Sequence, residues 1–143
     1  MYNLLVESKK RLGYAILFDC HSMPSKLNLE FSNSKYNNDP DIILGDLNGT
    51  SCSSFLINEV KAIFEKHNFC NKNNPFSGGY ITKHYGNPSD AIHVIQIEIN
   101  KKLYMNENSI KKNKNFENLR TKLTAVIEEL SNLYPTRKKI AAE

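Results

Sequence analysis

The sequence predicts an α/β fold in which a mixed sheet is flanked by helices. Short apolar runs at residues 15–18, 42–44 and 92–99 have the length and composition of buried strands. Two longer segments, 53–67 and 115–133, instead repeat apolar residues at helical spacing. Because the two patterns alternate along the chain, we expect the helices to pack against a sheet built from the strands.

The first elements are expected to be a short helix and a strand. Leucine and valine lie among Glu and Lys over residues 2–12, which predicts an amphipathic helix that ends at Gly13. Residues 14–19 then predict the first strand, which ends in polar side chains. The Ser, Asn, Pro and Lys content of residues 23–40 predicts a long loop.

A second strand and a helix follow in the middle of the chain. Residues 41–44 predict the strand, and the Gly, Asp and Asn residues of 45–50 predict a turn after it. Either Ser51 or Ser53 can cap the helix expected over residues 53–67.

The segment after this helix carries weaker patterns. Residues 68–70 predict a brief strand or turn, and the Pro and paired Gly of residues 73–80 predict a loop. Residues 80–85 are expected to be extended.

The segment 92–99 is the clearest strand in the sequence. Its isoleucines from position 95 onward share one face, whereas Gln96 and Glu98 lie on the other. The last helix ends near residue 133, so we expect one domain over residues 1–134 and a basic tail over 135–143.

Length and composition fit one domain of ordinary size and exclude several classes of protein. The chain has 143 residues and a formal net charge of +4, but Lys and Asn are spread over every segment, so we expect no nucleic-acid partner. Its three cysteines form no CxxC pair and no disulfide framework. We find neither a signal peptide nor an apolar run of membrane-spanning length, and therefore expect a cytoplasmic protein without a membrane partner.

Polar side chains at the end of the first strand are the first candidates for chemistry. Open α/β sheets bind ligands at the carboxyl ends of their strands, where His21 stands. Asp19 is two residues earlier and therefore on the same face, where its carboxylate can orient the imidazole for metal binding. The alternative is a surface or core histidine beside an ordinary strand-end aspartate.

Glu98 is the second candidate, because a carboxylate within an isoleucine-rich strand is costly to bury unpaired. Partial burial raises the pKa of a glutamate and suits it to general acid–base catalysis. Alternatively, Glu98 lies on a solvated sheet face and pairs with a lysine.

The loop before the 92–99 strand offers candidate groups for binding a substrate. Glycine lets the backbone approach a ligand, an amide can donate to a carboxylate, and a lysine can bind an anion. An ordinary turn followed by an exposed polar segment is the alternative. The candidates are Asn74, Gly78, Gly79, Tyr80 and Lys83.

Four segments, taken together, carry a family resemblance. They are 19–24 (DCHSMP), 45–52 (GDLNGTSC), 74–82 (NPFSGGYIT) and 95–100 (IQIEIN), the last followed by LYM at 103–105. In this order they resemble the N-formylglutamate amidohydrolase family, and they cover nearly the whole chain.

The resemblance implies a phosphorylase/hydrolase-like fold similar to that of zinc carboxypeptidases. It implies that His21 binds zinc and that Glu98 activates a zinc-bound water. Asp19, on the same strand face as His21, would orient the imidazole. The implied reaction is hydrolysis of N-formyl-L-glutamate, or a similar N-acyl amino acid, to formate and glutamate, a step of histidine breakdown. The loop at 74–82 and Lys83 are expected to hold the substrate carboxylates.

The resemblance covers the C-terminal half of the family domain. In the wider group two further zinc ligands come from a segment well before the histidine strand, whereas only about twenty residues precede His21 here. We therefore expect an incomplete fold with an exposed apolar edge or face. The missing ligands would come from outside this chain, from a partner chain or a homo-oligomer. The alternatives are a truncated, inactive fragment of the family and a non-enzymatic binding module.

Overall fold

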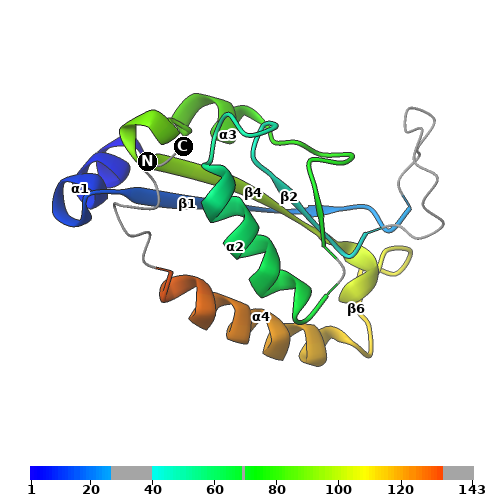
Figure 1. The fold of residues 1–143 in the computed structure, drawn as a ribbon. Helices are drawn as coiled ribbons and strands as arrows, with labels where there is room; N and C mark the ends of the chain where they lie inside the picture. Colours follow the sequence, from blue (N-terminus) through cyan, green and yellow to red (C-terminus); the bar gives the residue numbers. More distant parts are fainter. Residues whose placement is uncertain (27–39, 69, 134–143) are drawn as a thin grey trace.

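The computed structural model describes residues 1–26, 40–68 and 70–133, and its centre is a four-stranded mixed sheet (Figure 1). The spatial order of the strands is β1 (Ala15–Met23), β4 (Ile92–Asn100), β2 (Ile42–Gly45) and β3 (Cys70–Lys72). β1 runs parallel to β4, β2 runs antiparallel to β4, and β3 is parallel to β2. This arrangement confirms the mixed sheet that the sequence predicts.

Helices lie on both faces of this sheet. They are α1 (Tyr2–Leu12), α2 (Ser54–Glu65), α3 (Tyr80–Tyr85) and α4 (Phe116–Ser131). The remaining described elements are the 3₁₀ helices η1 (Pro88–Asp90) and η2 (Lys101–Leu103) and the antiparallel strands β5 (Met105–Asn106) and β6 (Lys111–Lys112). None of the described helices is both long and apolar enough to cross a membrane.

α2 and α4 lie on one face of the sheet and form the main core with it (Figure 1). Ile95 and Ile97 of β4 point into this core, as the alternation of the strand predicts. Ile57 of α2 is fully buried and Val126 of α4 nearly so. The amphipathic helices therefore hold the sheet by burying their apolar faces.

α1 and α3 cover the beginning of the opposite face. Leu5 of α1 and Tyr85 of α3 pack with Ala15, Leu17 and Ile92 at the start of β1 and β4. Side chains of a strand alternate between faces, so the same face continues with polar residues toward the carboxyl ends of both strands. These polar residues are Asp19, His21, Gln96 and Glu98.

Most predicted elements are confirmed with shifted boundaries. The helices predicted at 2–12, 53–67 and 115–133 are α1, α2 and α4. The strand predicted at 14–19 continues to residue 23, because its polar end pairs with β4 over its whole length. The short strand predicted near residue 70 is β3.

Ser53 rather than Ser51 caps α2. The Ser53 hydroxyl accepts a hydrogen bond from the Leu56 amide at 3.3 Å. The Ser51 hydroxyl instead donates to the Val94 carbonyl at 2.8 Å, which ties this turn to β4.

The prediction of an extended segment at residues 80–85 is wrong, because this segment is α3. Its Ile and Thr residues favour a strand, but local hydrogen bonds and packing prevail. The Lys83 amide and the Thr82 hydroxyl both donate to the Gly79 carbonyl, and Tyr85 packs on the apolar cluster at the start of β1.

Two predictions fall largely or wholly outside the described residues. They are the long loop at 23–40, of which residues 27–39 are not described, and the basic tail at 135–143 with the domain boundary after residue 134.

Candidate active site

The register of β1 against β4 brings the two main candidate residues together. His21 is the direct partner of Glu98, and Asp19 is the direct partner of Gln96. Partners in adjacent strands project from the same face of a sheet. The four side chains therefore form one polar cluster beside the strand ends.

Asp19 holds the imidazole of His21. The Nε2 atom of His21 lies 2.9 Å from Oδ2 of Asp19, and the aspartate side chain is 19% exposed against 47% for the histidine. A histidine engaged through Nε2 keeps Nδ1 as the ring atom that can meet a ligand or a proton. The structure thus places Asp19 where it can orient His21.

Glu98 is partly buried, and its neighbours shift its pKa in opposite directions. Burial raises the pKa of Glu98 above its ordinary value; the neighbouring His21 and a hydrogen bond from Gln96 lower it, and Asp19 raises it. The net direction of the pKa shift is upward, which moves the carboxyl toward the range of a general acid or base.

Gln96 is a member of this cluster that our sequence reasoning left without a role. Its Nε2 atom donates a hydrogen bond to Oε1 of Glu98 at 2.9 Å, and the residue is 7% exposed. The strand alternation already places the two residues on one face, so this pattern could have identified Gln96. The hydrogen bond fixes one carboxylate oxygen of Glu98 and leaves the other to face a reactant.

The loop before α3 lies directly on this end of the sheet. A Cβ atom on Gly45 would meet the Ser77 backbone at 2.6 Å, so the loop backbone rests against β2. The Leu47 amide donates to the Ser77 carbonyl at 2.7 Å. A Cβ atom on Gly79 would lie 3.3 Å from Oε1 of Gln96, which brings the Gly79 backbone to the polar cluster.

A buried aspartate anchors the start of this loop. Asp46, only 1% exposed, accepts hydrogen bonds at Oδ1 from the Asn73 side-chain amide at 2.6 Å and from the Gly49 backbone at 3.0 Å. The Asp46 amide donates in return to Oδ1 of Asn73 at 2.9 Å. The residues around Asp46 predict only a turn, since nothing local shows that this carboxylate bonds to a residue 27 positions away.

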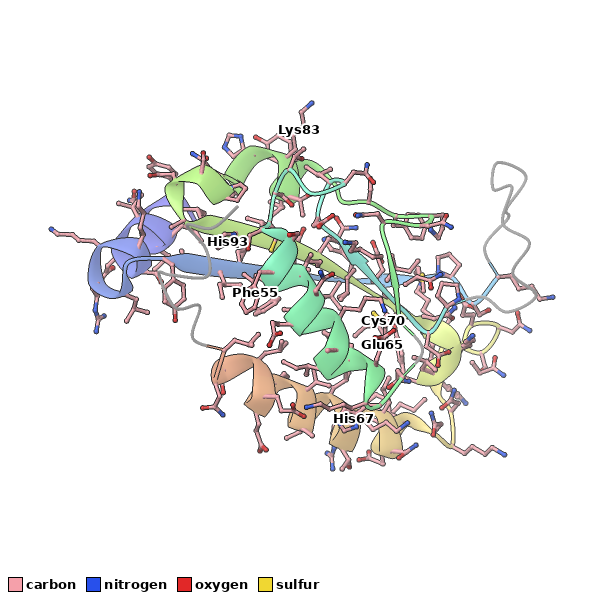
Figure 2. The ribbon with its side chains drawn as sticks, viewed as in Figure 1. Phe55, Glu65, His67, Cys70, Lys83 and His93 are labelled. Carbon is pink, nitrogen blue, oxygen red and sulfur yellow. The ribbon has the colours of Figure 1, made fainter. Side chains whose placement is uncertain are left out.

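The remaining predicted substrate-binding residues are distributed over this loop and α3. Gly78 has a φ of 129°, a conformation that favours glycine, and packs on Thr82. Tyr80 is 71% exposed and stacks on the His84 ring at 5.0 Å. Asn74 is exposed, and Figure 2 shows Lys83 extending away from the sheet. The structure therefore brings Gly79 to the cluster, while Lys83 points elsewhere.

The described residues do not make a zinc site by themselves. Within ranges 1–26, 40–68 and 70–133, no group of three or more His, Cys, Asp or Glu side chains could hold a metal ion. Catalytic zinc in proteins is usually held by three protein ligands. His21 supplies one imidazole, and the carboxylate of Asp19 is engaged with that imidazole. The pair therefore offers fewer than the three protein ligands that catalytic zinc usually has.

The cluster of an imidazole, its partner carboxylate and a partly buried glutamate contains groups that general acid–base catalysis uses. The model of the N-formylglutamate amidohydrolase family matches residues 1–105, and the chain belongs to this family. The resemblance seen in the sequence is confirmed.

Two curated relatives carry the name N-formylglutamate deformylase. The Pseudomonas putida protein is 35% identical over 101 residues, which are 69% of this chain and 36% of the relative. The Pseudomonas aeruginosa protein is 34% identical over 105 residues, which are 72% of this chain and 38% of the relative. The chain thus matches well under half the length of each.

A solved structure of the same family has a similar fold. It is the N-formylglutamate amidohydrolase from Ralstonia eutropha JMP134, with a TM-score of 0.82 and 27% sequence identity. The match covers 91% of this chain and 47% of the other. The described fold is therefore that of about half of this solved relative.

Proposed function

We propose that this chain supplies part of the active site of a zinc-dependent amidohydrolase that converts N-formyl-L-glutamate, or a similar N-acyl amino acid, to formate and glutamate. The observation that carries the proposal is the register pairing of His21 with Glu98 within a chain of this family. The names of the two Pseudomonas relatives support the substrate. We also propose that the whole family domain, of which this chain matches a part, has a fold similar to that of zinc carboxypeptidases.

Glu98 is the proposed general base. Its carboxylate takes a proton from water as the water oxygen attacks the formyl carbon, and it returns that proton to the nitrogen as the C–N bond breaks. The hydrogen bond from Gln96 holds one oxygen of the carboxylate during both transfers. A raised pKa fits this double role, since the group must release the proton as readily as it takes it.

His21, oriented by Asp19, is the proposed zinc ligand of this chain. The contact between Nε2 and the Asp19 carboxylate fixes the ring and leaves Nδ1 for coordination. Because the described residues fall short of a zinc site, the proposal requires two further ligands from outside them.

The loop before α3 is the proposed substrate-binding segment. The Gly79 backbone lies beside Gln96 and Glu98, so a substrate bound near the cluster would meet it. We assign Asn74, Gly78, Tyr80 and Lys83 to the same segment, where they would contact the substrate carboxylates. Of these, Lys83 would have to turn toward the cluster from the position seen in Figure 2.

Formate release from N-formyl-L-glutamate tests the proposal. It is measured on the chain alone with added zinc, and on the chain together with the part of the Pseudomonas putida relative that it does not match. We expect release in the second mixture that a zinc chelator abolishes. Absence of release from a correctly assembled complex would contradict the proposal.

A second reading is an inactive fragment of the family. The shortage of metal ligands among the described residues favours it. Failure of the assembled complex to bind zinc would support this reading over the first.

A further inference from the structure

Three consecutive residues after β2 form a left-handed turn. Leu47, Asn48 and Gly49 have φ values of 51°, 56° and 90°. A leucine rarely adopts this conformation, because its Cβ atom then lies too close to the following carbonyl oxygen. Strained backbone of this kind persists where surrounding contacts hold it, and it is concentrated at functional sites. Contacts from neighbouring residues must therefore stabilise this turn.

Asp46 stabilises the turn from a buried position. Its backbone carbonyl accepts hydrogen bonds from the Gly49 amide at 3.2 Å and from the Ser51 amide at 3.0 Å. Its carboxylate also accepts from the Gly49 amide, at 3.0 Å through Oδ1. Because Asp46 is only 1% exposed, water has little access to compete for these contacts. The shape of the turn therefore depends on the Asp46 carboxylate.

The same carboxylate oxygen binds the segment that leads to α3. Oδ1 of Asp46 accepts from Nδ2 of Asn73 at 2.6 Å, and the Asp46 amide donates to Oδ1 of Asn73 at 2.9 Å. Asn73 is itself left-handed, with a φ of 58°, and its amide donates to the Leu44 carbonyl at 2.9 Å. One carboxylate thus joins two left-handed segments of the backbone.

Close contacts at two glycines keep the turn against the segment around α3. A Cβ atom on Gly78 would lie 3.3 Å from Cδ2 of Leu47, and one on Gly86 would lie 2.5 Å from the Cβ atom of Ser51. Ser51 also exchanges hydrogen bonds with Val94, because its hydroxyl donates to the Val94 carbonyl and its carbonyl accepts from the Val94 amide, each at 2.8 Å. The turn therefore contacts both the segment around α3 and strand β4.

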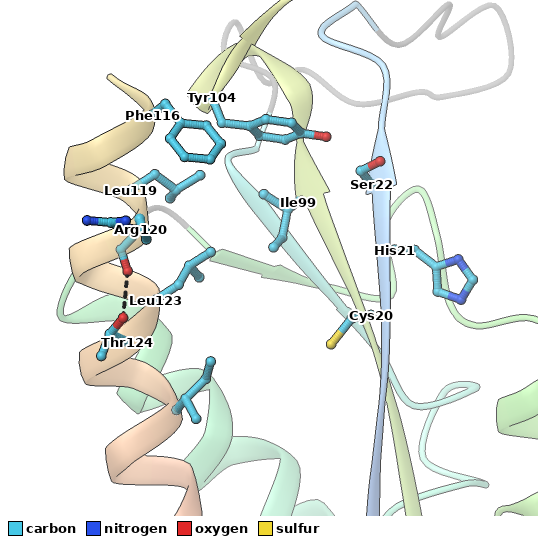
Figure 3. Close-up of a pocket in the computed structure, with 11 residues that line it drawn as sticks. Cys20, His21, Ser22, Ile99, Tyr104, Phe116, Leu119, Arg120, Leu123 and Thr124 are labelled. Carbon is cyan, nitrogen blue, oxygen red and sulfur yellow. Dashed lines mark hydrogen bonds between the residues drawn. The ribbon is translucent and has the colours of Figure 1, made fainter. Parts of the chain in front are cut away.

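This segment reaches the face of the sheet that carries the polar cluster. Figure 3 shows His21 projecting away from α4, on the side of β1 opposite to Cys20. On the His21 face, a Cβ atom on Gly79 would lie 3.3 Å from Oε1 of Gln96, whose Nε2 atom donates to Glu98. A displacement of the segment would therefore change the space between Gly79 and the proposed general base.

We infer that Asp46 is a positioning residue of the candidate site. By holding the left-handed turn and Asn73 together, it sets where the Gly79 backbone lies relative to Glu98. A substrate beside Glu98 would then meet this backbone already in place to bind it. The inference rests on the proposed function for the reaction that Asp46 serves, whereas the placement of Gly79 belongs to the chain without substrate or zinc.

Two substitutions at Asp46 separate its acceptor oxygen from its charge. Asp46→Asn keeps an acceptor for the Asn73 side chain and the Gly49 amide, whereas Asp46→Ala removes it. Val126→Ala is the matched control, because it removes a buried side chain from the core between α2 and α4 on the other face of the sheet. If Asp46→Ala does not fold, Asn73→Ala replaces it, since that change breaks the link between the two segments and leaves the bond from Gly49 to Asp46.

NMR on the full chain, without zinc or substrate, measures the placement of the segment. In Asp46→Ala the Leu47 amide, which donates to the Ser77 carbonyl, should exchange with solvent about tenfold faster than in the wild type. The side-chain amide resonance of Gln96 should also shift. Asp46→Asn should keep both values near the wild type, and Val126→Ala should leave the Gln96 resonance unchanged. An unchanged Gln96 resonance in Asp46→Ala, or the same shift in Val126→Ala, would overturn the inference.

Steady-state kinetics of formate release separates the positioning role from the reaction. On the assembled, zinc-containing protein, Asp46→Ala should raise KM for N-formyl-L-glutamate by about tenfold and change kcat by less than about threefold. The reason is that the displaced backbone binds substrate, while the hydrogen bond from Gln96 to Glu98 remains. Wild-type KM in an active Asp46→Ala protein would contradict the positioning role alone. Absence of formate release from the wild type, with the NMR changes present, would contradict the proposed function alone.

Discussion

Glu98 of β4 and His21 of β1 are direct partners across two parallel strands. The pairing places a carboxyl with a raised pKa beside an imidazole that Asp19 holds at 2.9 Å. An error of one residue in register would send one of the two side chains to the opposite face, toward α4. The hydrogen-bonded register of the sheet is therefore what assembles the candidate site.

The raised pKa of Glu98 predicts how its contribution to stability depends on pH. A carboxyl whose pKa is higher in the folded state stabilises the fold when protonated, and this contribution is lost as pH rises through the folded pKa. Glu98→Gln mimics the protonated form, so we expect its melting temperature to exceed the wild type's at neutral pH. The difference in melting temperature between the variant and the wild type should vanish at a pH below the ordinary pKa of glutamate. Thermal melts at both pH values check this, and Glu59→Gln, at an exposed position of α2, is the matched control.

Removal of the Asn73 side chain should destabilise the fold. In Asn73→Ala the buried Asp46 carboxylate loses one hydrogen-bond donor, and the Asp46 amide loses its acceptor. We expect the free energy of unfolding to fall by about 1–3 kcal/mol. Urea unfolding measures the change. Asn74→Ala, at the exposed neighbouring position, should stay within about 0.5 kcal/mol of the wild type. Equal costs at the two positions would contradict the role given to the Asp46–Asn73 contact.

A methyl group at Gly45 should displace the loop before α3. In Gly45→Ala the new Cβ would lie 2.6 Å from the Ser77 backbone, and such overpacking costs about 1–3 kcal/mol. Gly79→Ala should cost less, because its nearest neighbour is the end of the Gln96 side chain at 3.3 Å. Urea unfolding of the two variants compares them, and a larger loss in Gly79→Ala would show that the loop does not rest on β2.

Zinc affinity of the assembled complex should depend on both members of the Asp19–His21 pair. His21→Ala removes a proposed ligand, and Asp19→Asn should weaken binding by about 10–100-fold because it loosens the ring that carries the ligand atom. Competition with a chromogenic chelator measures the affinity. His84→Ala is the control, since His84 is exposed on α3 and stacks on Tyr80. Wild-type affinity in His21→Ala would remove this residue from the proposed site.

The sequence predicts most of the fold because its strong patterns are local. The isoleucine alternation of 92–99 and the apolar stripes of α2 and α4 are visible residue by residue and survive in the structure. The strand prediction for residues 80–85 is wrong because two interactions stabilise a helix there. They are the hydrogen bond from the Thr82 hydroxyl to the Gly79 carbonyl and the packing of Tyr85 on the apolar cluster.

The candidate site was predictable only in part. Asp19 and His21 are two residues apart, so their shared face follows from strand geometry alone. The approach of Gly79 to Gln96, and the contact between Asp46 and Asn73, depend on how distant segments fold together. No local pattern specifies either contact.

One substitution tests the proposed role of the His21–Glu98 pairing most directly. Formate release is measured on the assembled complex with zinc, comparing Glu98→Gln with the same change at the exposed Glu59. If Glu98 is the general base, kcat/KM falls by about 10²–10⁴-fold in Glu98→Gln and stays near wild type in Glu59→Gln. Full activity of a folded complex that carries Glu98→Gln would contradict the proposal. Glu98 would then be part of the polar cluster without a role in catalysis.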